Sequence, residues 1–249
     1  TSVAPQIETF EAARVRTTQP VNLGAYELGV RAWAAAVAAY GEAERTTLDK
    51  ALRLAREALA IDPHCCSALR AIGFAQWQNI YFCMADSASD ALDEGIDATT
   101  RAITIDNGDH FAHLWKGMLL FQSGQENTGL GHMRRSHDLN PNDSLTLMCL
   151  GFCEASSGDP QKGIVYCANA LRLSPRDPRG CLVLSLIGLG DLVRAKSEFQ
   201  LFFDLAPEFV KARLAGQWLS TNPEFRRRAT TFLRIAAGLE DPRMADALR

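Results

Sequence analysis

The chain has 249 residues, of which 47% are hydrophobic, and a formal net charge of −3. This composition is ordinary for a folded domain, and so small a net charge gives no strong field that would attract nucleic acid or an anionic membrane. No apolar run reaches the roughly 18–20 residues that a membrane-spanning helix requires.

Residues 1–21 are expected to form a linker or an N-terminal cap. They contain one short possible helix, over 6–16. The run Thr17-Thr18-Gln19-Pro20 follows it and is typical of a break in helical structure.

The first pair of helices is predicted between residues 22 and 63. Asn22 is a suitable N-cap for a helix that continues to about Tyr40. Residues 41–45 break this helix, and a second helix is expected over about 47–61. The two helices together form one repeat.

The second unit, 64–107, varies the pattern by insertion. Counted from Pro63 to Asn107 it spans 44 residues, ten more than the later units. The additional residues fall around 80–87, so we expect a long first helix or an intervening loop at that point.

Units 108–141 and 142–175 are the most regular. Pro141 lies 34 residues before Pro175, and small residues recur at the same offsets in both units, where two helices would approach closely. These small residues are Gly151, Gly163 and Ala170 in the second unit, matched by Gly117, Gly129 and Ser136 in the first, and the turn glycine Gly124 falls where Gly158 does.

The last predicted unit, 176–207, is two residues short, so its first helix must be trimmed. Residues 208–249 then read as C-terminal capping helices. The first is expected to reach about Trp218, and the second to begin at the N-capped run Asn222-Pro223-Glu224.

The 34-residue period and the recurring endings Ile61-Asp62-Pro63, Leu139-Asn140-Pro141 and Leu173-Ser174-Pro175 resemble the tetratricopeptide repeat (TPR) family over most of residues 20–207. The resemblance implies an all-α, right-handed helical solenoid. It would contain about five helix–turn–helix repeats with capping helices, and it would act as a protein-interaction module.

A closer resemblance is to the C-terminal TPR region of bacterial class III adenylate/guanylate cyclase-like proteins. It rests on 22–28, on 58–63, on the lengthened second repeat and on 171–178. It implies a regulatory module that forms the C-terminal part of a larger bacterial signalling protein. The alternatives are part of a nucleotide cyclase whose catalytic domain lies upstream, and a free-standing scaffold that oligomerises.

No enzyme activity is expected of this chain itself. The sequence shows no strand pattern, no nucleophile–base pair, no glycine-rich phosphate loop and no HExxH motif. We therefore expect no catalytic residues and no cofactor.

The TPR resemblance also indicates which side chains line the concave face. The expected partner-binding groove consists of Tyr26, Trp33, Arg70, Phe74, Trp77, Phe111, Leu114, Met118, Phe121, Met148 and Phe152. Only Arg70 among them is charged, so no clamp for a carboxylate is expected. Two explanations of so apolar a face remain open: a groove for a partner's apolar segment, or burial by the protein itself.

The expected partner is a protein or peptide, or an upstream domain of the same polypeptide, with self-association possible. Nucleic acid and membrane are not expected. The arginines at 226, 227, 228 and 234 are interpreted as a polar outer face that shields the end of the array, with a basic patch as the alternative.

Metal sites are not expected either. His110 and His113 lie one turn apart beside Asp106 and Asp109, which favours an Asp-capped helix start with two exposed imidazoles over a metal site. The seven cysteines include no CxxC pair. We interpret them as small buried hydrophobes in a reducing compartment and expect a cytoplasmic location.

Overall fold

The computed structural model describes residues 22–42, 44–174, 180–218 and 220–248. These residues form helices joined by short turns, and no strand occurs among them. The predicted linker or cap at 1–21, with its possible helix, lies outside the described residues. No helix in the described part of the chain is both long and apolar enough to cross a membrane.

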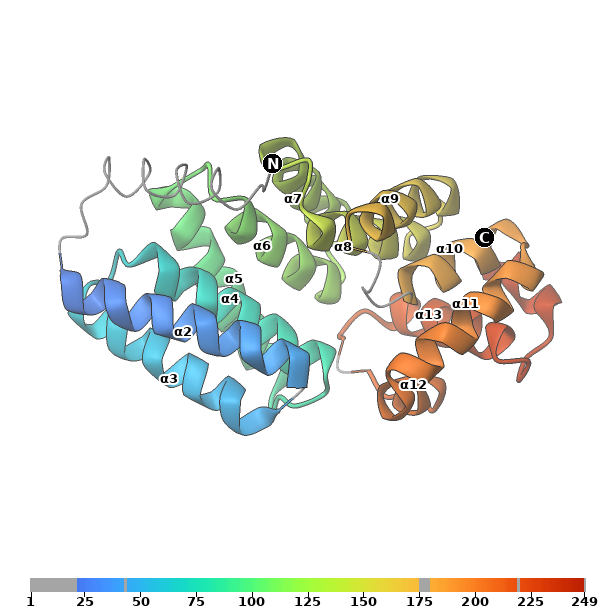
Figure 1. The fold of residues 1–249 in the computed structure, drawn as a ribbon, viewed down its shortest axis with the longest axis horizontal. Helices are drawn as coiled ribbons and strands as arrows, with labels where there is room; N and C mark the ends of the chain where they lie inside the picture. Colours follow the sequence, from blue (N-terminus) through green and yellow to red (C-terminus); the bar gives the residue numbers. More distant parts are fainter. Residues whose placement is uncertain (1–21, 43, 175–179, 219, 249) are drawn as a thin grey trace. The chain divides into compact units, whose positions relative to one another are not determined.

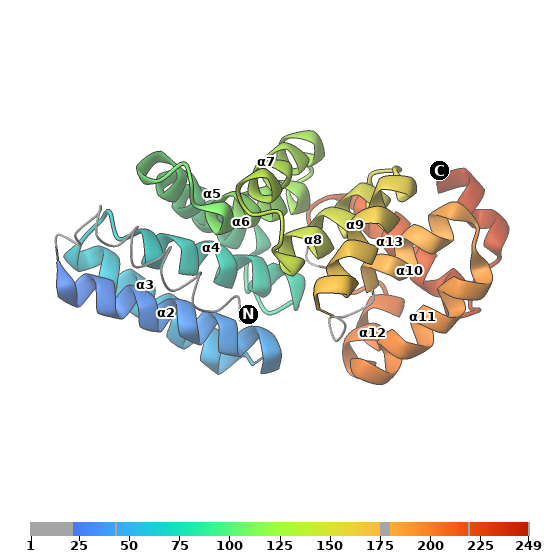
Figure 2. The ribbon, with the colours of Figure 1, turned by 45° about the horizontal axis from the view of Figure 1, so that its top comes forward.

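Consecutive helices lie side by side as antiparallel pairs, as α2 with α3 and α6 with α7 show in Figures 1 and 2. The α-helices are α2 (Leu23–Glu42), α3 (Arg45–Ile61), α4 (Cys66–Tyr81), α5 (Ala88–Ile105), α6 (His110–Gln122), α7 (Glu126–Leu139), α8 (Ser144–Ser156), α9 (Pro160–Leu173), α10 (Gly180–Leu189), α11 (Leu192–Leu205), α12 (Pro207–Leu214) and α13 (Pro223–Ala236). A 3₁₀ helix, η1 (Pro242–Leu248), follows them. The predicted all-α helical repeat fold is therefore confirmed.

The chain divides into two compact units, Thr1–Ile72 and Gly73–Arg249, and each is described by itself. In the first unit, α2 packs on α3 and presents small side chains to its neighbours. Ala25, Ala32 and Ala36 are completely buried. Gly29 has no room for a larger side chain, because a Cβ there would lie 2.8 Å from the Cys65 sulfur.

In the second unit, the recurring glycines lie where two helices of a pair meet. A Cβ on Gly117 would lie 2.7 Å from the Gly129 carbonyl oxygen, and one on Gly151 would lie 3.0 Å from the Gly163 carbonyl oxygen. The close approach predicted from these small residues is confirmed, and it explains why the same offsets recur in successive repeats.

Side-chain caps fix where several helices begin. The carboxylates of Asp109, Asp143, Asp159 and Asp191 each accept a hydrogen bond from the backbone N–H three residues further on. Such a cap satisfies one of the otherwise unpaired N–H groups of the first turn. Asn222 acts in the same way for α13, as its sequence predicts.

The helix lengths agree with one predicted irregularity of the array and differ from the prediction at α12. The second repeat does carry additional residues between Tyr81, where α4 ends, and Ala88, where α5 begins. Helix α10 is described from Gly180, directly after residues 175–179, which lie outside the described part of the chain, so its predicted shortening stays a prediction. The expected helix from Pro207 to about Trp218 was too long: α12 stops at Leu214, because Gly216 adopts a φ of +76° that closes the helix.

Candidate protein-interaction surface

Three predicted groove residues lie in the first unit, and the structure brings two of them together. The Arg70 guanidinium of α4 lies 4.7 Å from the centre of the Trp33 ring of α2, which is a cation–π distance. Tyr26 lies two turns earlier on α2 and is exposed. An aromatic and cationic surface therefore follows one side of α2.

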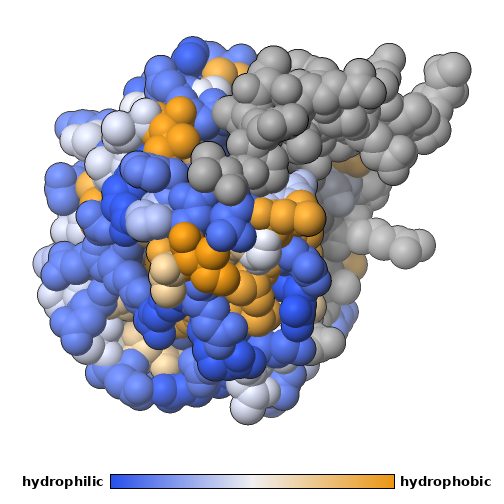
Figure 3. Space-filling model, turned by 90° about the vertical axis from the view of Figure 1, so that its left-hand side faces the viewer, coloured by the Kyte–Doolittle hydropathy of each residue, from blue (hydrophilic) through white to orange (hydrophobic). Residues whose placement is uncertain are grey.

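Helix α2 also exposes aliphatic side chains to solvent. Leu23, Tyr26, Val30 and Val37 are 75%, 36%, 43% and 49% exposed. Their separations of three, four and seven residues place them along one stripe of the helix. Figure 3, which views the molecule from the side on which α2 begins, shows apolar side chains gathered among hydrophilic ones.

The outer side of α3 contrasts with this stripe. Its exposed residues include Asp49, Lys50, Arg53 and Glu57, and Arg53 forms an ion pair with Glu57 at 2.9 Å. An apolar face left open on a helix of a folded protein commonly marks a contact surface, whereas a charged face is simply solvated. We refer to Leu23, Tyr26, Val30 and Val37 as the α2 stripe.

In the second unit, the predicted groove residues of α4 are interior residues. Phe74 and Trp77 are 3% and 2% exposed. Phe74 stacks on Trp115 of α6 with ring centroids 4.2 Å apart, and Trp77 lies tilted against the same ring at 5.1 Å. Trp115 is fully buried and was not among the predicted site residues.

The predicted groove residues of α6 and α8 differ in exposure. Leu114, Met118 and Phe121 are buried, and the Met118 sulfur lies 3.8 Å from the thiol of Cys153 on α8. Phe111, Met148 and Phe152 are half-buried.

The chain's own C-terminal segment covers part of this predicted groove. The Phe225 ring of α13 lies 5.6 Å from Phe121 of α6 and 5.5 Å from Phe152 of α8. Trp218, in the preceding turn, packs edge-on against the same ring at 5.2 Å. Phe225 therefore packs on this part of the predicted groove, where Phe121 is buried and Phe152 is half-buried.

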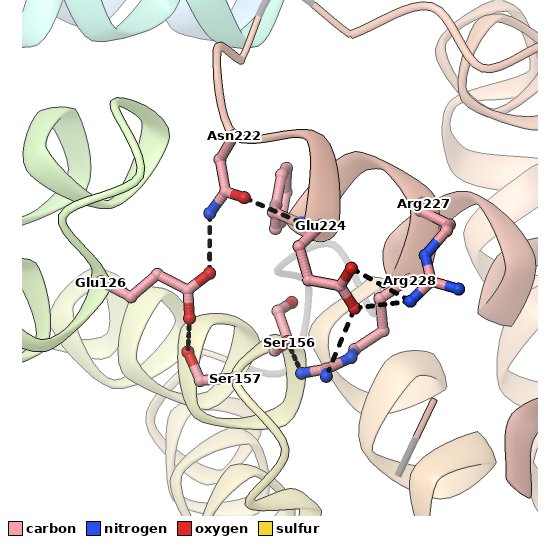
Figure 4. Close-up of polar contacts among 8 residues, drawn as sticks. Glu126, Ser156, Ser157, Asn222, Glu224, Arg227 and Arg228 are labelled. Carbon is pink, nitrogen blue, oxygen red and sulfur yellow. Dashed lines mark hydrogen bonds and ion pairs between the residues drawn. The ribbon is translucent and has the colours of Figure 1, made fainter. Parts of the chain in front are cut away.

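Polar contacts hold this segment in place (Figure 4). Asn222 donates its side-chain amide to Glu126 at 2.7 Å, and the other oxygen of Glu126 accepts from the Ser157 hydroxyl at 3.0 Å. The backbone N–H of Thr221 and the hydroxyl of Ser220 both donate to the Gln122 carbonyl, at 3.1 and 2.9 Å. These bonds tie the start of α13 to the end of α6 and to the start of α7, and Glu126 of α7 is bonded in turn to the residue that follows α8.

Arg228 corrects the expectation that all four arginines of α13 form a polar outer face. Its side chain is only 15% exposed, and its guanidinium donates to the Ser156 carbonyl and pairs with Glu224 (Figure 4). Arg226 and Arg227 are exposed as expected, and Arg227 pairs with Glu224 at 2.9 Å.

The expected pair of exposed imidazoles at the start of α6 is also wrong. Asp109 does cap the helix, but His113 is buried and its Nδ1 lies 3.1 Å from Nδ1 of His132 on α7. Burial, together with the nearby Lys116 and His113, lowers the pKa of His132 to about 4. Burial also lowers the pKa of His113.

The cysteines are mostly small core residues, as interpreted from the sequence. Cys65, Cys149, Cys153 and Cys167 are buried, whereas Cys66 and Cys83 are half-buried. Among the described residues, no group of three or more His, Cys, Asp or Glu side chains could hold a metal ion.

Comparison with solved structures identifies the fold. A thermophilic TPR protein from Thermus thermophilus superposes with a TM-score of 0.57 at 16% identity, over 82% of this chain and 98% of its own. A tetratricopeptide repeat protein from Parabacteroides merdae gives 0.52 at 12% identity, over 89% and 77%. The APC/C hetero-tetramer Cut9–Hcn1 contains a chain that gives 0.58 at 18% identity, over 95% and 50%.

No family model and no curated protein matches the sequence. The solved structures show that the chain has the fold of TPR proteins, and they establish this fold alone.

Proposed function

We propose that the chain is a protein-interaction module whose partner binds along the α2 stripe. The proposal rests mainly on four apolar side chains that are exposed along one face of α2. Tyr26 and Trp33, with Arg70 over the Trp33 ring, extend this surface with the residue types that dominate protein interfaces. An apolar helix of a partner, laid along α2, is the ligand that this stripe fits best.

The neighbouring folds support an interaction role in general terms. The chain that resembles this one over 95% of its length belongs to the Cut9–Hcn1 hetero-tetramer, so the fold serves there within a protein assembly. We extend that role to this chain as part of the proposal.

The wider context is a finer part of the same proposal. The motifs at 22–28, 58–63 and 171–178 support a regulatory module in the C-terminal part of a larger bacterial signalling protein. The partner would then be an upstream domain of the same polypeptide. The described cysteines form no disulfide, which supports a reducing, cytoplasmic compartment.

The second candidate is part of a nucleotide cyclase whose catalytic domain lies upstream. The same sequence motifs favour it. Incubating the chain with ATP, Mg²⁺ and Mn²⁺ should give no cyclic nucleotide, because the proposed role assigns no chemistry to these residues. Turnover by the purified chain would reverse that assignment.

The interaction proposal is tested by changing the charge of the stripe. Val30→Glu with Val37→Glu adds two negative charges to α2, and Lys50→Glu changes the charge of α3 by the same amount (+1 to −1). Proteins that co-purify with the native chain should be lost when the α2 double variant is used for affinity purification. They should still be recovered with Lys50→Glu. Equal recovery from both variants would show that the stripe is not the partner surface. Light scattering on the same samples shows whether the partner is a second copy of the chain.

A further inference from the structure

One helix end in the described part of the chain breaks a local rule that the others obey. Six helix ends there close with the same pair of backbone hydrogen bonds. The N–H of one residue bonds to the carbonyl three residues earlier, and the N–H of the following residue bonds to the carbonyl five residues before it. Five of them place a glycine with positive φ at the first of these positions: Gly124, Gly158, Gly190, Gly216 and Gly238. The sixth places Cys83 there.

Cys83 therefore holds a backbone conformation that suits glycine. Its φ is +59°, and no other described residue except glycine has a positive φ. The N–H of Cys83 bonds to the Ile80 carbonyl at 3.2 Å, and that of Met84 bonds to the Asn79 carbonyl at 2.8 Å. A side chain in this left-handed position is unfavourable, so its presence suggests that the side chain itself is used.

The Cys83 thiol faces a buried cation. Nη1 of Arg213 donates to the Cys83 sulfur at 3.2 Å and also donates to the Gln217 carbonyl oxygen. The thiol donates in turn to that same carbonyl at 3.5 Å. Arg213 is 2% exposed, and its Nε has no hydrogen-bond partner.

Aromatic rings rather than carboxylates surround this guanidinium. Its carbon lies 4.4 Å from the centre of the Trp218 ring, 4.5 Å from Phe209 and 5.3 Å from Tyr81. Within the described residues, no Asp or Glu oxygen lies at ion-pair distance from Arg213. The Cys83 sulfur is therefore the side-chain atom beside this cation that can carry a negative charge.

We propose that Cys83 is a site of oxidation by hydroperoxides, with Arg213 as the group that stabilises negative charge on its sulfur. Partly exposed cysteines next to a cation are the thiols that react this way. The sulfur attacks one peroxide oxygen, an S–O bond forms and the O–O bond breaks. Sulfur is oxidised by two electrons to a sulfenic acid, the peroxide is reduced, and the thiol proton leaves on the released water, or on the alcohol if the hydroperoxide is organic.

The test uses a second thiol of the same chain as its control. Cys66 is half-buried like Cys83, but it lies at the start of α4 in ordinary helical backbone. The full chain is treated with dilute hydrogen peroxide and a sulfenic-acid trapping reagent, and each cysteine is quantified by mass spectrometry. Cys83 should be labelled faster than Cys66, even though the N-terminus of α4 also favours a thiolate at Cys66. Equal rates for the two thiols would overturn the proposal.

Two variants separate the chemistry from the fold. Arg213→Met should reduce Cys83 labelling toward the Cys66 rate, and an unchanged rate in a folded variant would count against the role of Arg213. The ranking of the two thiols in the unmodified protein decides the proposal even if this variant does not fold. Cys83→Gly should keep or raise the denaturation midpoint, because glycine suits the position. A marked loss of stability would show that Cys83 is held there for packing instead.

Discussion

At the scale of single residues, the burial of His113 and His132 makes stability depend on pH. Both imidazoles are partly or fully buried between α6 and α7, beside the cations Lys116 and Arg135. Each pKa lies below the ordinary value of 6.5, so the unfolded chain binds protons that the folded chain does not. Stability is therefore complete above pH 6.5 and falls as the pH approaches 4.

Urea unfolding at pH 7.5 and at pH 4.5 measures this effect. The native chain should lose more unfolding free energy between these pH values than a His132→Asn variant, because the variant lacks the His132 imidazole. Carboxylates titrate in the native chain and in the variant alike, so they do not contribute to the difference. His64→Ala, at an exposed position, serves as the control and should behave like the native chain. A pH dependence that His132→Asn does not reduce would contradict the assignment.

Side-chain contacts between different helices are not predictable from the repeat pattern. The repeat pattern predicts that His110 and His113 start a helix, but it does not say which residue of the next helix each will face. His132 comes from α7, and the pairing depends on how the two helices are rotated against each other. The sequence register also misses Cys83. Counted from Gly73 as Gly158 is counted from Gly151, the turn residue would be Ile80, but α4 has 16 residues against 13 in α6 and α8.

At the scale of secondary-structure elements, the contact between the paired helices can be tested with two glycines of one repeat. Gly117→Ala should destabilise the protein by several kcal/mol, about the range found for overpacked cores, because its Cβ would meet the Gly129 carbonyl at 2.7 Å. Gly131→Ala, on the exposed side of α7 where nothing lies within 4 Å, should instead stabilise it by up to about 1 kcal/mol. Denaturant midpoints measure both, and equal effects would contradict the packing.

The attachment of α13 is the second element to test. Phe225 is 1% exposed and contacts rings from α6, from α8 and at Trp218. Phe225→Ala should cost about 3–5 kcal/mol of unfolding free energy, since it leaves a large cavity. Leu201→Ala, at a position that is 43% exposed on α11, should cost much less. If the two variants are equally stable, α13 does not pack as described.

Elements were the best predicted part of the structure. Helix caps, turn glycines and the spacing of small residues are local sequence signals. They therefore predict the positions of helices α2 to α11 closely from the sequence alone. Contacts between distant elements carry no such local signal. The packing of Phe225 against Phe121 joins residues about 100 apart in the chain, which no repeat pattern encodes.

At the scale of the whole molecule, the second unit explains why part of the predicted groove is closed. A repeat array must cover its ends, and α13 does so by packing against α8 and α10. It buries Phe232 and Leu233 together with Phe225. In the first unit, α2 instead presents apolar side chains to solvent. The α2 stripe is therefore the surface that we propose for the partner.

Site-specific photo-cross-linking can show whether a partner contacts the α2 stripe. A photoreactive amino acid replaces Val30 in the α2 stripe, and the same probe replaces exposed Lys50 on α3 as the control. If the partner binds along the α2 stripe, position 30 should give discrete cross-linked species in cells, and position 50 should give none of them. Identical species from both positions, or none from position 30, would contradict a partner on the α2 stripe.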